Sequence, residues 1–215
     1  MTLSRHVAVA GSLAMFGIWA CGGRPAADSV ERNLFVEPAE PLEVCPAGAE
    51  SLRISGTTNN NQPVAATNPE FSAELCDRLR AAQPSLTLGE VRSQLTSNAT
   101  VNGTHIGEAT MHAEACLFGG PPPTVVASLA ITASDGDVLY LTIRASRTPE
   151  SPPPPDSEDK GGGTITGGTG RFAGASGEFN LSAKSHGDLL PGTNVATERD
   201  IDINGYINLR TDNER

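Results

Sequence analysis

The chain is poor in aromatic residues and in positive charge. Aromatic side chains make up 4% of its 215 residues, and the single tryptophan, Trp19, lies close to the N-terminus. Because sugar-binding sites rely on flat aromatic surfaces, this composition disfavours carbohydrate recognition. The 15 Lys and Arg are outnumbered by 25 Asp and Glu, which gives a net charge of −10. Nucleic acids and anionic lipid surfaces attract clustered cations, so neither is an expected partner of the protein surface.

The first 23 residues have the pattern of a bacterial lipoprotein signal. Arg5 precedes an apolar run over residues 7–18, and Cys21 follows within the sequence IWACGG. The run is shorter than the roughly 20 residues that a transmembrane helix needs. We therefore predict a signal peptide over residues 1–20 and lipid attachment at Cys21. The alternative is cleavage as an ordinary secretory signal, which leaves Cys21 as a thiol.

The predicted anchor sets the expected location and the membrane partner. Acyl chains on Cys21 would hold the exported protein on a bacterial membrane. The residue after Cys21 is Gly22, whereas an Asp at this position retains some lipoproteins on an inner membrane. This favours the outer membrane or the cell surface. Residues 21–48 mix Gly, Ala, Pro, Asp and Glu without periodicity, so we expect a disordered tether there. A folded domain is predicted over residues 49–212.

Three cysteines remain once Cys21 is assigned to the lipid. Cys45, Cys76 and Cys116 allow three pairings, and one disulfide suits an oxidising compartment. We favour Cys45–Cys76, which would join the end of the tether to a surface helix. No CxxC or Cys/His spacing points to a metal, and no motif points to a cofactor.

Local signals predict one helix and one long loop. Asn68 as N-cap, Pro69 at the first helical position and apolar residues at 71, 75 and 79 predict a short helix packed on the outside of a sheet. Residues 147–163 contain four consecutive prolines and a charged run, so we predict an exposed loop between strands.

Most of the remaining chain alternates between apolar and polar residues, as half-buried antiparallel strands do. The alternation is clear at 125–133, 139–145, 179–183 and 201–209, and further strands are expected at 51–56, 90–96, 105–116 and 164–166. About eight strands predict an all-β fold, a small antiparallel barrel with one short surface helix; a β-sandwich is the alternative. A barrel is preferred because closure removes the edge strands.

Three segments in order resemble a known family. Residues 104–110 (THIGEAT), 131–137 (ITASDGD) and 166–177 (TGGTGRFAGASG) are similar to motifs of bacterial secreted proteins with an allene oxide cyclase-like barrel. The resemblance covers roughly residues 50–210 and implies a calycin-like, dirigent-related barrel. It implies no reaction, and no residue matches a catalytic motif of the plant enzymes.

The glycine-rich segment also resembles the dinucleotide loop of short-chain dehydrogenases. That loop must open a helix, whereas an alternating strand follows here and too few residues remain for a nucleotide fold. We therefore predict a structural corner in which Phe172 plugs the barrel end and Arg171 lies at the surface.

The strongest polar constellation lies on one predicted strand. Glu108, Thr110, His112 and Glu114 share one face, and a histidine between carboxylates suits a base or a metal ligand. The opposite face of the strand is apolar and should point inward, so this row is predicted to be exposed. His105 and His186 have no evident partner in the sequence. No catalytic residue is assigned.

These observations favour a non-catalytic, membrane-anchored binding or interaction module for a small apolar ligand. Met111, Leu141 and Phe179 are the interior residues expected to contact such a ligand. The alternative is an isomerase or cyclase that acts on a hydrophobic substrate in the barrel mouth, and a purely structural envelope protein is a third hypothesis. An enzyme needs an acid, a base or an Arg among the inward residues, and the predicted alternation places none there.

Overall fold

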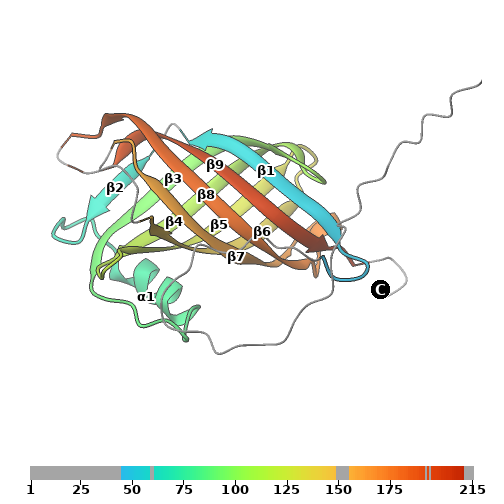
Figure 1. The fold of residues 1–215 in the computed structure, drawn as a ribbon, viewed down its shortest axis with the longest axis horizontal. Helices are drawn as coiled ribbons and strands as arrows, with labels where there is room; N and C mark the ends of the chain where they lie inside the picture. The colour runs from blue at the N-terminus through green and yellow to red at the C-terminus, as the bar shows by residue number, and fades with distance from the viewer. Residues whose placement is uncertain (1–44, 59–60, 149–154, 192, 194, 211–215) are drawn as a thin grey trace, which may run out of the picture.

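The computed structural model describes residues 45–58, 61–148, 155–191, 193 and 195–210 (Figure 1). The predicted signal peptide, Cys21 and the predicted tether up to residue 44 lie outside the described residues.

Eight antiparallel strands form a closed barrel, which confirms the predicted fold class and excludes the sandwich. Hydrogen bonding runs in the order β1-β9-β8-β7-β6-β5-β4-β3, and β1 also pairs with β3, so the sheet closes on itself. A ninth short strand, β2, pairs with β3 outside the ring. The strands are β1 (Glu50–Thr58), β2 (Gln62–Ala65), β3 (Val91–Gly103), β4 (Gly107–Phe118), β5 (Thr124–Ala133), β6 (Val138–Arg147), β7 (Glu158–Gly168), β8 (Ser176–Leu189) and β9 (Ala196–Asn208).

Alternation along each strand divides the barrel into an apolar interior and a polar exterior. On β4, Met111 is 1% exposed and belongs to the core, whereas Thr110 and His112 on either side are exposed. The same alternation holds on β6 and β8, where Leu141 and Phe179 face inward. The period of two that the sequence shows therefore places side chains correctly along these strands.

One end of the barrel is closed by a side chain, as predicted. A short 3-10 helix, η1 (Gly170–Phe172), follows β7 and turns Phe172 into the core, where it is completely buried. Gly170 has φ +54°, and a Cβ there would overlap the Asp137 carboxylate, so this corner requires glycine. Arg171 lies at the surface and forms an ion pair with Asp135. The glycine-rich segment is a structural corner.

β7 begins at Glu158, so the prediction of an exposed loop through residue 163 is wrong at its C-terminal part. Residues 158–163 pair with β6 on one side and with β8 on the other. Gly163 makes room for a large neighbour, because a Cβ there would lie 2.6 Å from the ring of Phe179. Gly205 opposes Phe179 from β9 in the same way, and this side chain fills the space between both strands.

Helix α1 (Ala73–Ala81) packs on the outside of the barrel, as predicted, but begins later than expected. Its N-cap is Ser72 rather than Asn68. The Asn68 side chain instead accepts a hydrogen bond from the Glu70 N–H at 2.9 Å, which holds a turn before the helix. Leu79 of α1 packs with Phe118 and other outward residues of β4 and β5 in a second, smaller core. The helix lies below the ends of β3 and β4 in Figure 1.

The disulfide joins Cys76 to Cys116, so the predicted Cys45–Cys76 pairing is wrong. Cys116 points outward from β4 directly beneath α1, and the two Cα atoms lie 5.6 Å apart. The bond fastens the helix to the barrel wall rather than to the tether.

Candidate functional site

The interior of the barrel contains a cavity away from the Phe172 plug. It has a volume of about 60 Å³ and lies toward the end where β8 turns into β9, which we call the β8–β9 end. Its wall is largely apolar and receives residues from all eight strands of the ring. Side chains on that wall include Met111, Ala113, Ala127, Leu129, Ile143 and Ala145.

The three predicted ligand contacts do not share this cavity. Met111 lies on its wall. Leu141 and Phe179 belong to the same hydrophobic core and are 1% and 2% exposed, but the wall of the cavity does not include them. Phe179 is packed against Gly163 and Gly205 instead. The structure therefore brings only one of the three residues to an accessible interior space.

A buried carboxylate forms the polar end of the cavity. Asp159 of β7 is 4% exposed, and its Oδ2 lies 2.6 Å from Nη2 of Arg199 on β9. Its Oδ1 lies 3.6 Å from Nε of Arg147 on β6. Arg199 also donates from Nε to Oγ of Ser185 at 3.2 Å, and its carbonyl accepts from Thr58 Oγ1 at 3.4 Å. Both Asp159 oxygens are thus engaged with guanidinium groups.

The sequence prediction that the interior holds no acid and no Arg is wrong. The charged run that contains Asp159 predicts an exposed loop, and Arg199 precedes the apolar positions that show the alternation of β9. A usable signal exists, because counting back in twos from Ile203 through Ile201 places Arg199 on the inward face. The same count from Ala145 reaches Arg147. A charged residue at an inward position near the end of a strand breaks the alternation of apolar and polar residues. The residue type alone therefore does not identify it as inward-facing.

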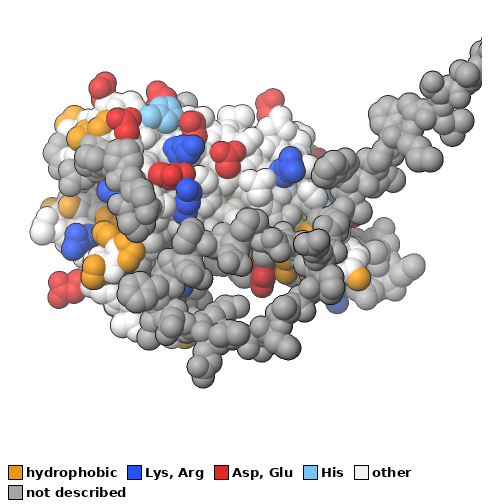
Figure 2. Space-filling model, in the orientation of Figure 1, with side chains coloured by type: hydrophobic (Ala, Val, Ile, Leu, Met, Phe, Trp, Pro, Cys, Tyr) orange, Lys and Arg blue, Asp and Glu red, His pale blue; other side chains and the backbone are white. Residues whose placement is uncertain are grey.

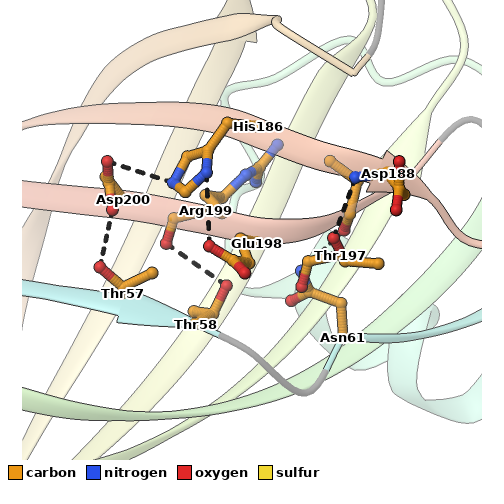
Figure 3. A network of polar contacts seen from close by, with 10 residues as sticks. Thr57, Thr58, Asn61, His186, Asp188, Thr197, Glu198, Arg199 and Asp200 are labelled. Atoms are coloured by element: carbon orange, nitrogen blue, oxygen red, sulfur yellow. Dashed lines mark hydrogen bonds and ion pairs between the residues drawn. The ribbon is translucent and has the colours of Figure 1, made fainter.

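A second polar network covers the outer face of the same strand ends (Figure 3). Nδ1 of His186 on β8 lies 3.4 Å from Oε2 of Glu198 on β9, and Nε2 lies 3.2 Å from Oδ2 of Asp200. The Thr57 hydroxyl on β1 donates to Oδ1 of Asp200 at 2.6 Å. This hydrogen bond, followed by that of His186, lowers the pKa of Asp200. The expectation that His186 lacks a partner is therefore wrong, because the β8–β9 register sets it opposite Glu198.

Further hydrogen bonds hold the rim of the barrel at this end. The Asn61 side chain donates to the carbonyls of Ala196 and Thr197 at 3.0 and 3.3 Å. The Asp188 N–H donates to the Thr197 hydroxyl at 3.2 Å. Acidic and basic side chains are interspersed over the face that carries β1, β8 and β9, with a histidine among acidic groups (Figure 2). The hydrogen bonds and ion pairs at this end connect strands β1, β8 and β9 to one another.

The polar row on β4 points outward, as predicted, and its members do not form a common site. His112 Nδ1 lies 2.9 Å from Oδ1 of Asn98, and Glu114 forms a 2.7 Å ion pair with Arg78 of α1. Glu108 and Thr110 are exposed. The other histidine thought to lack a partner, His105, lies with Nε2 3.0 Å from the Ser51 carbonyl oxygen, so that expectation is also wrong.

Among the described residues, no group of three or more His, Cys, Asp and Glu side chains is arranged to hold a metal ion. No helix in that part of the chain is both long and apolar enough to span a bilayer.

Comparison with known proteins adds no functional assignment, since no protein-family model and no curated protein matches the sequence.

Proposed function

We propose that this protein is a membrane-anchored bacterial lipoprotein whose barrel is a non-catalytic binding module for a small apolar ligand. The observation that carries the proposal is the apolar cavity inside the barrel, with Met111 on its wall and charged groups at one end. Eight-stranded barrels of this kind are either filled by side chains or hold one small ligand. The described barrel is filled at the Phe172 end and hollow toward the β8–β9 end.

The volume of the cavity limits what it accepts. About 60 Å³ is small beside the roughly 300–1,000 Å³ of pockets that hold drug-sized ligands. A short alkyl group or a small ring substituent matches that space better than a long acyl chain. The proposed ligand is therefore a small apolar molecule, or the apolar end of a larger one.

The anchor is supported by the N-terminal sequence and by the cysteines. Cys21 follows an apolar run of signal-peptide length, and the Cys76–Cys116 disulfide suits an oxidising compartment outside the cytoplasm. We place the protein on the outer membrane or the cell surface, with acyl chains on Cys21 as its contact with the membrane.

The second candidate is an isomerase or cyclase that acts on a hydrophobic substrate. It is favoured by one observation, the Asp159 carboxylate and the Arg199 guanidinium at the end of an apolar cavity. General acid–base catalysis requires a group within hydrogen-bond reach of the reacting proton. Both Asp159 oxygens face guanidinium groups, which leaves a binding module as the better-supported proposal.

Mass spectrometry of the full chain purified from membranes tests both parts of the proposal. Intact mass should show acyl groups that map to Cys21, and a disulfide between Cys21 and Cys45 would contradict the anchor. Under native conditions, an excess mass lost on denaturation would identify a bound ligand. Ala127→Leu, which fills the cavity, should abolish that excess mass, whereas the outward-facing Thr164→Leu should retain it. Conversion of the released ligand into an isomer by fresh protein would favour the enzyme.

A further inference from the structure

The outer face of strands β1, β3, β4 and β5 carries a second hollow besides the interior cavity. Four residues form a row across these strands, because the registers pair Asn98 with His112, His112 with Ala130, and Ala130 with Tyr140. Side chains paired across an antiparallel sheet stand on the same face. The small Ala130 side chain therefore leaves a gap between the larger His112 and Tyr140.

The dimensions of this gap follow from sheet geometry. Neighbouring strands lie about 4.8 Å apart, so His112 on β4 and Tyr140 on β6 are separated by roughly 10 Å at the backbone. The hollow has a volume of about 440 Å³ and extends from Ala130 toward β3 and β1. Its polar lining includes Asn98, Thr100, Thr110, His112 and Thr132. We expect a spacing of this size to admit a six-membered ring over Ala130.

Tyr140 supplies an aromatic surface beside Ala130, next to the lining of the hollow rather than part of it. It is 42% exposed, while most large apolar side chains of the described barrel are buried. A tyrosine ring offers an apolar face together with a polar hydroxyl. On the other side of Ala130, the hydrogen bond to Asn98 occupies Nδ1 of His112 and orients the ring, which leaves Nε2 on its opposite side for a ligand.

Hydroxyl groups form a second row beside the first. Thr100 pairs with Thr110, and Thr110 pairs with Thr132, so three threonines lie side by side across β3, β4 and β5. Each hydroxyl both donates and accepts hydrogen bonds. None of the residues that line the hollow is an acid, a Lys or an Arg, although the chain has a net charge of −10. The hollow therefore matches an uncharged ligand with many hydroxyl groups.

We propose that this outer hollow binds a neutral saccharide, with one pyranose ring stacked on Tyr140 over Ala130. The ring hydroxyls would hydrogen-bond to His112 and to the threonine row. The polar side chains of this site point to the opposite side of the barrel wall from the interior cavity, and Met111 is shared between the two walls. This site reverses for one position the expectation from composition that carbohydrate recognition is disfavoured.

The test is a titration of the ¹⁵N-labelled full chain, in detergent, with maltotetraose, cellotetraose and chitotetraose, followed by NMR. At least one of these saccharides should shift the amide signals around Ala130, Thr110 and Thr132. Tyr140→Ala should weaken binding by about tenfold or more, the size of effect expected for loss of an aromatic stacking partner. Tyr140→Phe should retain most of the affinity, because the ring remains.

A matched control separates stacking from a general effect of removing a tyrosine. Tyr206 is the other tyrosine of the chain and lies on β9, away from this row, so Tyr206→Ala should leave saccharide affinity unchanged. The proposal is overturned if none of the three saccharides binds at about 10 mM, weaker than the usual range of specific recognition. It is also overturned if the shifts map to another face or if Tyr140→Ala has no effect.

Discussion

Asp159 and Arg199 form a 2.6 Å ion pair across the inside of the barrel, although strand β8 separates the two strands that carry them. The pair lies over the inner face of β8, where Ser185 accepts a hydrogen bond from the same guanidinium. It connects β7 and β9 at the end of the barrel that has no apolar plug in the described structure. At the other end, Phe172 packs into the core instead.

Removal of the Asp159 carboxylate should destabilise the barrel. Asp159→Ala leaves Arg199 without its charge partner, and breaking a buried pair from one side costs about 3–5 kcal/mol. Because the Arg199 side chain is 23% exposed, water compensates in part and we expect about 2–3 kcal/mol. The free energy of unfolding in urea measures this loss. Asp156→Ala, at an exposed position three residues earlier, should change stability little, and an equal loss in both variants would contradict the role of the pair.

Loss of the Cys76–Cys116 bond should destabilise the protein mainly by freeing the unfolded chain. The two cysteines are 40 residues apart, and a closed loop of that length predicts a contribution of about 4 kcal/mol. Cys76→Ala and the double variant with Cys116→Ala should lose similar amounts in urea unfolding, since either change removes the bond. Peptide mapping without reduction that finds Cys76 bonded to Cys45 would contradict the pairing.

Acid titration should reveal the contact between Thr57 and Asp200. The hydrogen bond from Thr57, and then that from His186, lowers the pKa of Asp200 below its ordinary value. A carboxyl whose folded pKa is depressed adds stability above its unfolded pKa, about 3.9, and that stability is lost as pH falls through the folded pKa. Thr57→Val should raise the pKa of Asp200 toward its ordinary value, as measured by NMR of the side-chain carboxyl carbon. Thr100→Val, on the neighbouring strand, is the control and should leave that titration unchanged.

The space beside Phe179 should not tolerate an added methyl group. In Gly163→Ala, the new Cβ would meet the Phe179 ring at 2.6 Å and also the Thr142 carbonyl oxygen. Overpacking of this kind costs about 1–3 kcal/mol, which thermal unfolding would detect as a lower midpoint. Thr164→Ala changes the next, outward-facing residue and should stay within about 0.5 kcal/mol of the parent protein. Equal midpoints for both variants would show that the glycine is not required.

Much of the barrel could be predicted because alternation is a local property. Residues 139–145 and 179–183 show which side chains face inward without any knowledge of their neighbours. Phe172 could likewise be assigned to the plug from the glycines around it. The start of β7 could not be predicted, because its glycines and charges resemble a loop and only pairing with β6 and β8 makes them a strand.

The sequence by itself determined the all-β class and the inward and outward faces of the clearly alternating strands. Each of these depends on residues close together along the chain, so no tertiary contact is needed to recognise them. The tertiary structure alone decided that Cys76 bonds to Cys116, that Asp159 meets Arg199, and that an alanine separates His112 from Tyr140. These relationships join residues that the chain keeps far apart, and they exist only once closure of the barrel fixes strand order and register.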